Sequence, residues 1–302
     1  MRARPGTPPG RSVAVHGSDD RVNATVRNLA WIAVLALGLS VASAAGTPGS
    51  VNTTYGVDGV ADGGAFYAED AVVLADGSVL LAGIDPSGTT ETFAVRKIDA
   101  DGNLDTDFGT SGVAAVFGAP PRSQNWARTI VVGPDGRIFV GGQRTYTTQV
   151  TSGKGKKQTT EDVDVTVGSV LALNADGSVD TDFGDDGYLD GIVAHDLAVR
   201  GTSASYDVLI ASTSGVQVEV AGSGKGKKGG TQTVDTLELA IHAVDGFSGA
   251  DVTSFGQDGV LLDDPSETTN DIPLAMHMDG LGRIVVMMRH SDAFSSAEAV
   301  LV

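Results

Sequence analysis

One nine-residue element occurs four times and constrains the fold more than any other feature of the chain. It reads NTTYGVDGV at 52–60, DTDFGTSGV at 105–113, DTDFGDDGY at 180–188 and VTSFGQDGV at 252–260. Self-similarity of this kind is typical of repeat architectures, in which each unit packs against its neighbours. The shared aromatic and glycine positions are predicted to shape turns and packing between units; they are Tyr55, Gly56, Gly59, Phe108, Gly109, Gly112, Phe183, Gly184, Gly187, Phe255, Gly256 and Gly259.

A second element alternates with the first and predicts β-hairpins. It reads ADGSVLLAG at 75–83, PDGRIFVGG at 134–142, TSGVQVEVAG at 213–222 and GLGRIVVMM at 280–288, and apolar runs such as AVVL and TIVV precede it. Gly adopts the positive φ that tight hairpin turns need, so Asp-Gly between apolar segments is a hairpin signal. In the third unit, Thr213-Ser214-Gly215 is expected to replace the Asp-Gly turn.

A third apolar segment completes each unit, as in FAVRKI at 93–98 and VGSVLAL at 167–173. The order is therefore strand, turn, strand, loop, strand, turn, aromatic-Gly corner and a short fourth strand. Such a unit cannot bury both faces alone, and the units are long for the coils of a linear β-solenoid. The sequence predicts an all-β fold, a β-propeller built of about four four-stranded antiparallel repeats (blades). The predicted units are approximately 52–104, 105–179, 180–251 and 252–302.

The pairing of these two elements resembles the delta-60 repeat family, whose members are bacterial, are often secreted and are thought to form β-propellers. The resemblance extends over roughly residues 50–302 and is strongest at 99–113 and 174–188. The chain departs from the family's repeat pattern in the third unit and at DGLG, 279–282. The resemblance implies a fold but no established catalytic residues.

The fourth unit stops where its last turn is expected to begin. Closed propellers contain about four to eight blades. Two interpretations follow: the chain is part of a larger ring and is incomplete at its C-terminal end, or its first and last strands close a small ring.

The N-terminal part predicts export. Five Arg occur within residues 1–27, an apolar core follows at 29–45, and small residues end it at Ala42-Ser43-Ala44. These are the parts of a secretory signal peptide, assigned to 1–44, which leaves 45–302 as the repeat domain. The alternative is an uncleaved membrane anchor, but no basic cluster follows the apolar core. The predicted location is secreted, periplasmic or on the cell surface.

Charge and cysteine content exclude several functions. Without residues 1–44, 15 basic side chains face 36 acidic ones, a net charge of about −21. This surface repels nucleic acid. The chain contains no Cys, which excludes disulfides, thiolate metal sites and cysteine nucleophiles.

The turn DADGNLDTD raises the question of calcium, because Asp99, Asp101, Asn103, Asp105 and Asp107 occupy alternate positions. An EF-hand loop needs Gly at its sixth position and Glu at its twelfth. Here Gly102 is fourth and there is no such Glu. The favoured interpretation is that Asp and Asn bond to their own backbone, and no cofactor or metal is predicted.

The motif SGKGKK occurs at 152–157 and again at 223–228. A P-loop is rejected because neither Ser nor Thr follows the final Lys and no strand-to-helix context is expected. Two interpretations remain: solvated hairpin tips, or basic tips on adjacent blades that bind an anionic polymer or cell-surface group. The candidate binding residues are Lys154, Lys156, Lys157, Lys225, Lys227 and Lys228.

The histidines after residue 44 show no metal-ligand spacing and no recurrence at equivalent repeat positions; they are His195, His242, His277 and His290. A Gly-x-Ser-x-Gly elbow is also absent. The sequence therefore favours a non-enzymatic propeller that presents loops for binding, in adhesion or cell-envelope interaction. The partner would be a cell-surface polymer, glycan or protein. The alternatives are a secreted hydrolase or lyase acting on carbohydrates or lactones, and a purely structural scaffold.

Overall fold

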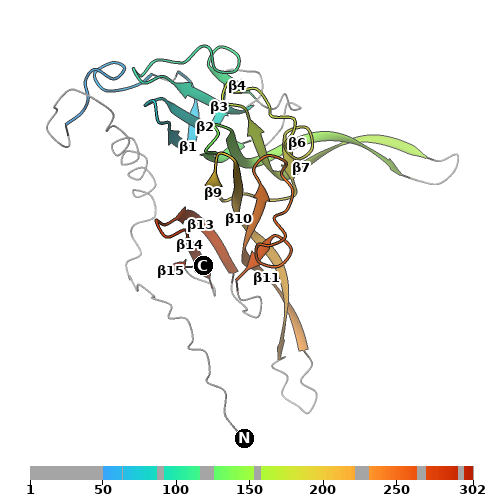
Figure 1. Ribbon diagram of the computed structural model, residues 1–302. Coiled ribbons are helices and arrows are strands. Elements are labelled where there is room, and N and C mark those ends of the chain that lie inside the picture. The colour runs from blue at the N-terminus through green and yellow to red at the C-terminus, as the bar shows by residue number, and fades with distance from the viewer. Residues whose placement is uncertain are drawn as a thin grey trace, which may run out of the picture.

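The computed structural model describes residues 50–62, 64–86, 92–115, 126–152, 158–221, 231–263, 270–291 and 296–301. Strands β1 to β15 and their connecting turns make up these residues, which contain no α-helix (Figure 1). The predicted signal peptide at 1–44 lies outside them.

The strands form four consecutive antiparallel sheets, each ordered as in the sequence. Sheet 1 contains β1 (Tyr67–Val73), β2 (Val79–Asp85), β3 (Thr92–Ile98) and β4 (Val113–Ala115). Sheet 2 contains β5 (Trp126–Val132), β6 (Ile138–Ser152), β7 (Thr159–Leu173) and β8 (Tyr188–Asp190). Sheet 3 contains β9 (Asp196–Thr202), β10 (Ser205–Ala221), β11 (Thr231–Asp245) and β12 (Val260–Leu262). Sheet 4 contains β13 (Asn270–Met278), β14 (Ile284–Ser291) and β15 (Ser296–Leu301).

The sheets pack face to face in succession, as the blades of a propeller do. The first strand of each sheet contacts the first strand of the next, from β1 through β5 and β9 to β13 (Figure 1). One hydrophobic cluster fills each junction between successive sheets. Phe108, Phe183 and Phe255 lie one in each cluster. The predicted all-β propeller of four-stranded antiparallel repeats is confirmed by this arrangement.

The four aromatic-Gly corners share one backbone conformation. In each, both glycines and the residue before the second glycine have positive φ, for example Gly109 at 56°, Ser111 at 55° and Gly112 at 87°. A Cβ atom on Gly109 would lie 2.4 Å from the carbonyl oxygen of Val113. Glycine is therefore required both by the left-handed backbone and by this close approach.

Three of the four corners also bond to the sheet that follows them. The Gly109 N–H donates a hydrogen bond to the Asp176 carbonyl oxygen in the β7–β8 turn of sheet 2 (2.7 Å). The Gly184 N–H bonds in the same way to Ser248 in sheet 3 (3.0 Å). The first corner, at 52–60, donates from Gly56 to Asp101 in sheet 1 (2.7 Å). The corner is thus a joint between neighbouring repeats as well as a change of chain direction.

The prediction that Thr213-Ser214-Gly215 forms the hairpin turn of the third unit is wrong. Thr213-Ser214-Gly215 lies inside β10, where Gly215 pairs with Leu237. The hairpin turn is instead Ser203-Ala204, between β9 and β10, because Thr202 pairs with Ser205. Gly201, with φ of 135°, precedes this turn and permits the tight reversal without an Asp-Gly pair.

Candidate binding surface on two extended hairpins

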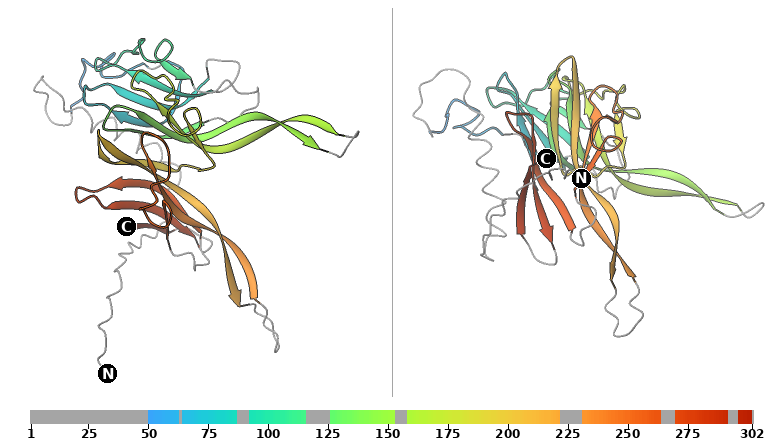
Figure 2. Two further views of the ribbon diagram at one scale, coloured as in Figure 1. Left: turned by 45° about the vertical axis from the view of Figure 1, so that its right-hand side comes forward. Right: turned by 60° about the horizontal axis from the view of Figure 1, so that its bottom comes forward.

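Sheets 2 and 3 each carry a hairpin that extends far beyond the rest of the sheet. Strands β6 and β7 have 15 residues each, whereas the equivalent β2 and β3 have 7. The equivalent pair in sheet 3, β10 and β11, has 17 and 15 residues. We call these two hairpins the arms; Figure 2 shows both projecting from the body of the molecule.

The β6–β7 arm is held together by paired strands along its whole length. The register runs without a break from Ile138 opposite Leu173 to Ser152 opposite Thr159. Ile138, Val170 and Leu173 are buried near the inner end, whereas the residues from Glu161 to Asp164 are mostly exposed. The outer half therefore stands in solvent as a two-stranded ribbon.

A ladder of side-chain hydrogen bonds covers one face of this ribbon. Thr147 donates to Asp164 (2.8 Å) and Gln149 donates to Asp162 (3.1 Å). Thr145 bonds to Thr166 (2.8 Å), and Thr151 bonds to Thr160 (3.2 Å). Cross-strand pairs of this kind each contribute about 0.2 to 1 kcal/mol, so the ladder stabilises a ribbon that has no second layer.

The opposite face of the ribbon is partly apolar. At its base, the Arg144 guanidinium forms an ion pair with Asp190 and lies over the rings of Tyr188 (4.4 Å) and Tyr146 (5.1 Å). Burial raises the pKa of the Tyr188 hydroxyl, so it stays protonated. Further out, Tyr146 is 38% exposed and Val150 is 47% exposed. The arm thus offers an aromatic and aliphatic contact surface together with hydrogen-bonding groups.

The predicted binding lysines belong to the segments that connect the arm strands. Residues 153–157 follow β6 and contain Lys154, Lys156 and Lys157; residues 222–230 follow β10 and contain Lys225, Lys227 and Lys228. All six lie outside the described residues. Both motifs occupy the same connection, between the second and third strands of adjacent sheets.

The inner strands contain two half-buried carboxyl groups that the sequence reasoning missed. Asp70 on β1 accepts a hydrogen bond from the backbone N–H of Ile130 on β5 (2.9 Å). Asp196 on β9 accepts from the Thr129 hydroxyl (2.9 Å) and from the Met276 N–H on β13 (2.6 Å). Burial raises the pKa of both carboxyl groups, and the charge of Asp196 raises that of Asp70 further.

These carboxylates join one sheet to the next, and their oxygens are engaged in doing so. The available signal was positional: each Asp directly precedes the apolar run of a first strand, as in DAVVL and DLAV. Recognising that position as special required knowing which strands lie innermost.

The four histidines after residue 44 are distributed over different parts of the fold. His195, just before β9, approaches Arg128 (3.4 Å), and burial together with that cation lowers its pKa. Burial also lowers the pKa of His242 on β11. His290 on β14 contacts Asp271 (2.6 Å), and His277 lies on β13. Among the described residues, no three His, Asp or Glu side chains form a group suited to holding a metal ion.

The Asp-rich turns are closed by their own side chains. Asp99 accepts from the N–H groups of Asp101 (3.0 Å) and Asn103 (2.8 Å). In the parallel turn, Asp176 accepts from the N–H and the hydroxyl of Ser178 (2.9 and 2.7 Å), which lowers the pKa of Asp176. These are the contacts expected where Asp and Asn side chains bond to the backbone of their own turn.

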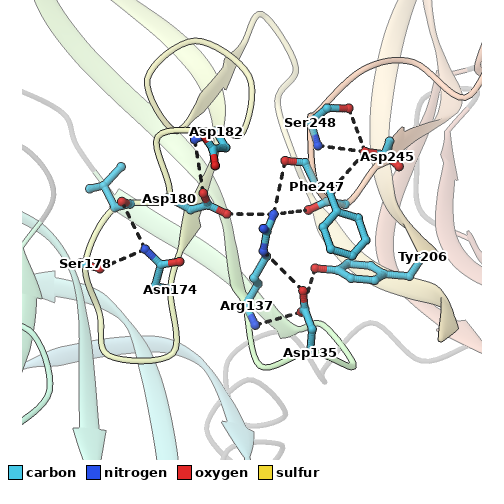
Figure 3. Close-up of polar contacts among 12 residues, drawn as sticks. Asp135, Arg137, Asn174, Ser178, Asp180, Asp182, Tyr206, Asp245, Phe247 and Ser248 are labelled. Atoms are coloured by element: carbon cyan, nitrogen blue, oxygen red, sulfur yellow. Dashed lines mark hydrogen bonds and ion pairs between the residues drawn. The ribbon is translucent and has the colours of Figure 1, made fainter. Parts of the chain in front are cut away.

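Arg137, in the β5–β6 turn at the end of β6 opposite the arm tip, connects sheets 2 and 3 (Figure 3). It pairs with Asp180 (2.9 Å) in sheet 2 and donates to the Gly246 and Phe247 carbonyl oxygens of sheet 3 (both 3.3 Å). Its guanidinium also lies 4.7 Å from the centre of the Phe247 ring.

Asp135 adds a second bond at this junction by accepting from the hydroxyl of Tyr206 (2.9 Å), whose pKa is raised by burial and by this bond. The two sheets that carry arms are therefore fixed to each other by hydrogen bonds and by the contact of the Arg137 guanidinium with the Phe247 ring.

Comparison with known proteins supports a β-propeller repeat family. Residues 74–108 match the sequence model of a domain of unknown function, DUF5122, described as a β-propeller. The matched region begins just after β1 and ends at Phe108, and so includes ADGSVLLAG at 75–83 and the first four residues of DTDFGTSGV. No curated protein matches the chain. Within the described part of the chain, no helix is long and apolar enough to span a membrane.

Proposed function

We propose that this chain is a non-enzymatic, exported binding protein that attaches to an anionic cell-surface polymer through its two arms. We further propose that it belongs to the delta-60 repeat family, on the paired Asp-Gly and aromatic-Gly elements quoted above. The location follows from the predicted signal peptide at 1–44.

The observation that carries the proposal is the extension of equivalent hairpins in two adjacent sheets. A propeller core does not need strands of 15 residues, because the equivalent strands of sheet 1 have 7. The polar ladder keeps the β6–β7 arm extended, and the hydrogen bonds of Arg137 to Gly246 and Phe247 fix sheet 2 to sheet 3. Two arms on a fixed base would contact one extended ligand at two points, which strengthens binding without new contacts.

Charge defines the class of ligand. The chain has a formal net charge of −18, so most of its surface repels polyanions. Six of its 20 basic residues nevertheless belong to the two SGKGKK motifs. Any attraction to a polyanion would arise from these local basic segments, and it would weaken with salt.

The test measures binding of the full chain to immobilised dextran sulfate at increasing salt. Replacing all six motif lysines with Ser is expected to reduce binding at least ten-fold at low salt. A matched variant with all six replaced by Arg keeps the charge and is expected to bind as the wild type does. Thermal unfolding of both variants checks that the core is unchanged. Equal binding by the Ser variant and the wild type would refute the proposal.

A further inference from the structure

The segment 50–62 has the structure of the end of a sheet, but the described residues contain no other strand of that sheet. Gly56, Asp58 and Gly59 have φ values of 57°, 54° and 87°, as in the corners that lead into β4, β8 and β12. Val60 occupies the position of the first residue of those strands. It is 64% exposed, and Val57 is 74% exposed. Within the part of the chain that the structure describes, the segment is a corner and fourth-strand position with no first three strands beside it.

Sheet 4, in contrast, has its first three strands but no fourth strand among the described residues. Its described strands are β13, β14 and β15, and β15 stands at the edge where sheets 1 to 3 carry a short fourth strand. An edge strand with free backbone groups is a template for pairing with another segment.

The last corner is also left without the contact that the other three make. The N–H groups of Gly56, Gly109 and Gly184 each bond to a turn of the following sheet, whereas Gly256 has no such acceptor among the described residues. A surface hollow of about 560 Å³ lies at this corner, lined by Gly256, Gln257, Asp258, Val260, Leu261 and Leu262.

The residues just before the first corner match the missing turn in sequence. GTPGSV at 46–51 aligns with DADGNL at 99–104 and NADGSV at 174–179, with glycine at the same position. Residues 46–49 lie outside the described part of the chain. Residues 50–62 therefore carry the corner and the fourth-strand position, and sheet 4 has no such fourth strand among the described residues.

We propose that segment 50–62 of one copy of this chain completes sheet 4 of a second copy, and that the reciprocal contact closes two chains into one ring. A second copy is required because Figure 1 shows this segment well apart from β15 of the same chain. Four sheets from each copy give a ring of about eight blades, within the known range.

The other sheets define the register of this contact. Val113 pairs with Arg96, Tyr188 with Leu171 and Val260 with His242. The equivalent of these partners on β15 is Val300, which pairs with Val286 on β14 as Arg96 pairs with Leu81 on β2. Val60 is therefore expected opposite Val300, and Ala61 opposite Ala299, in antiparallel pairing.

Cysteine cross-linking tests this register directly, because the chain has no Cys of its own. The full-length variants Val60→Cys and Val300→Cys are purified separately, mixed and oxidised. A disulfide-linked pair of the two variants is expected on a non-reducing gel, and light scattering of the wild type is expected to give twice the mass of one chain. Cα atoms of directly opposed residues lie within disulfide reach.

The control replaces Val60→Cys with Leu281→Cys, which places an exposed thiol on the β13–β14 turn. The heterodimer yield with Val60→Cys is expected to exceed this collision background at least ten-fold. A yield equal to the background would overturn the proposal. So would a Val60→Cys/Val300→Cys double variant that cross-links within one chain, or a wild-type mass of a single chain.

Discussion

At the scale of single residues, Asp196 shows how a half-buried charge can link three sheets. Its carboxylate lies on sheet 3 and accepts hydrogen bonds from Thr129 of sheet 2 and Met276 of sheet 4. Burial disfavours the charged form more than these bonds favour it, so the pKa of Asp196 lies above the ordinary 3.8. The folded chain therefore holds this proton at a higher pH than the unfolded chain does.

The sign of the pH dependence follows from this difference in proton binding. As the pH rises from 4 to 7, ionisation of Asp196 lowers the free energy of unfolding of the wild type. Asp196→Asn removes the ionisable group, so the stability of the variant relative to the wild type is expected to increase over this range. Urea unfolding of both proteins at several pH values measures the difference.

Asp176→Asn is the matched control, with the opposite expected trend. The bonds from Ser178 lower the pKa of Asp176 below the ordinary 3.8 of an Asp carboxyl. The wild type should therefore gain stability relative to the variant as the pH rises through that ordinary value. Parallel trends in the two variants would contradict the assignment of opposite pKa shifts.

At the scale of elements, the corners and the Asp-Gly turns were predictable because their conformations are local. The positive φ of Gly109 and Gly112 depends on residues within four positions of the chain, and the glycines in the sequence indicate it. The Ser203-Ala204 turn was missed because it uses neither Gly nor Asp in its central positions. The length of the arms was also missed, although Asp162, Asp164 and Thr166 alternate with Val as an exposed ribbon requires.

Backbone atoms approach each other closely inside a corner, so one added methyl group is expected to lower the stability of the fold strongly. Gly109→Ala places a Cβ 2.4 Å from the Val113 carbonyl oxygen in a left-handed conformation, and is expected to cost about 3 kcal/mol or more. Gly191→Ala has the same backbone problem, with φ of 95°, but no atom within 4 Å of the added Cβ. It should cost only about 1 to 2 kcal/mol. Chemical denaturation of both variants separates steric overlap from backbone strain, and equal losses would rule out the overlap.

At the scale of the whole molecule, the four sheets depend on junctions that sequence reasoning could not locate. The contacts of Asp70 with Ile130, and of Arg137 with Phe247, join residues far apart in the chain. Local patterns carry no information on such pairs. The repeats themselves predicted that the units pack in series, because each unit leaves apolar faces to bury.

Arg137 should determine whether the sheets unfold together. Arg137→Gln leaves the buried carboxylate of Asp180 without its cation, and is expected to cost about 2 to 3 kcal/mol. It should also broaden the calorimetric transition, because sheets 1 and 2 lose part of their coupling to sheets 3 and 4. Differential scanning calorimetry measures both effects.

Arg283 occupies the equivalent turn position in sheet 4 and provides the comparison. Its side chain is 51% exposed and pairs with Asp279 of its own turn. Arg283→Gln should therefore change stability by no more than about 0.5 kcal/mol and leave the transition sharp. Similar losses in the two variants would show that Arg137 does not link the sheets.

The arms show where a chain of this kind can gain residues during evolution. In both arms the added residues lie beyond the buried ends of the second and third strands, and the corner and turn contacts lie elsewhere in the sheet. Lengthening this connection leaves the contacts between sheets intact, so it can acquire foreign sequence at little cost to folding. The same position in sheet 1, between β2 and β3, is therefore a suitable place to graft a third recognition peptide.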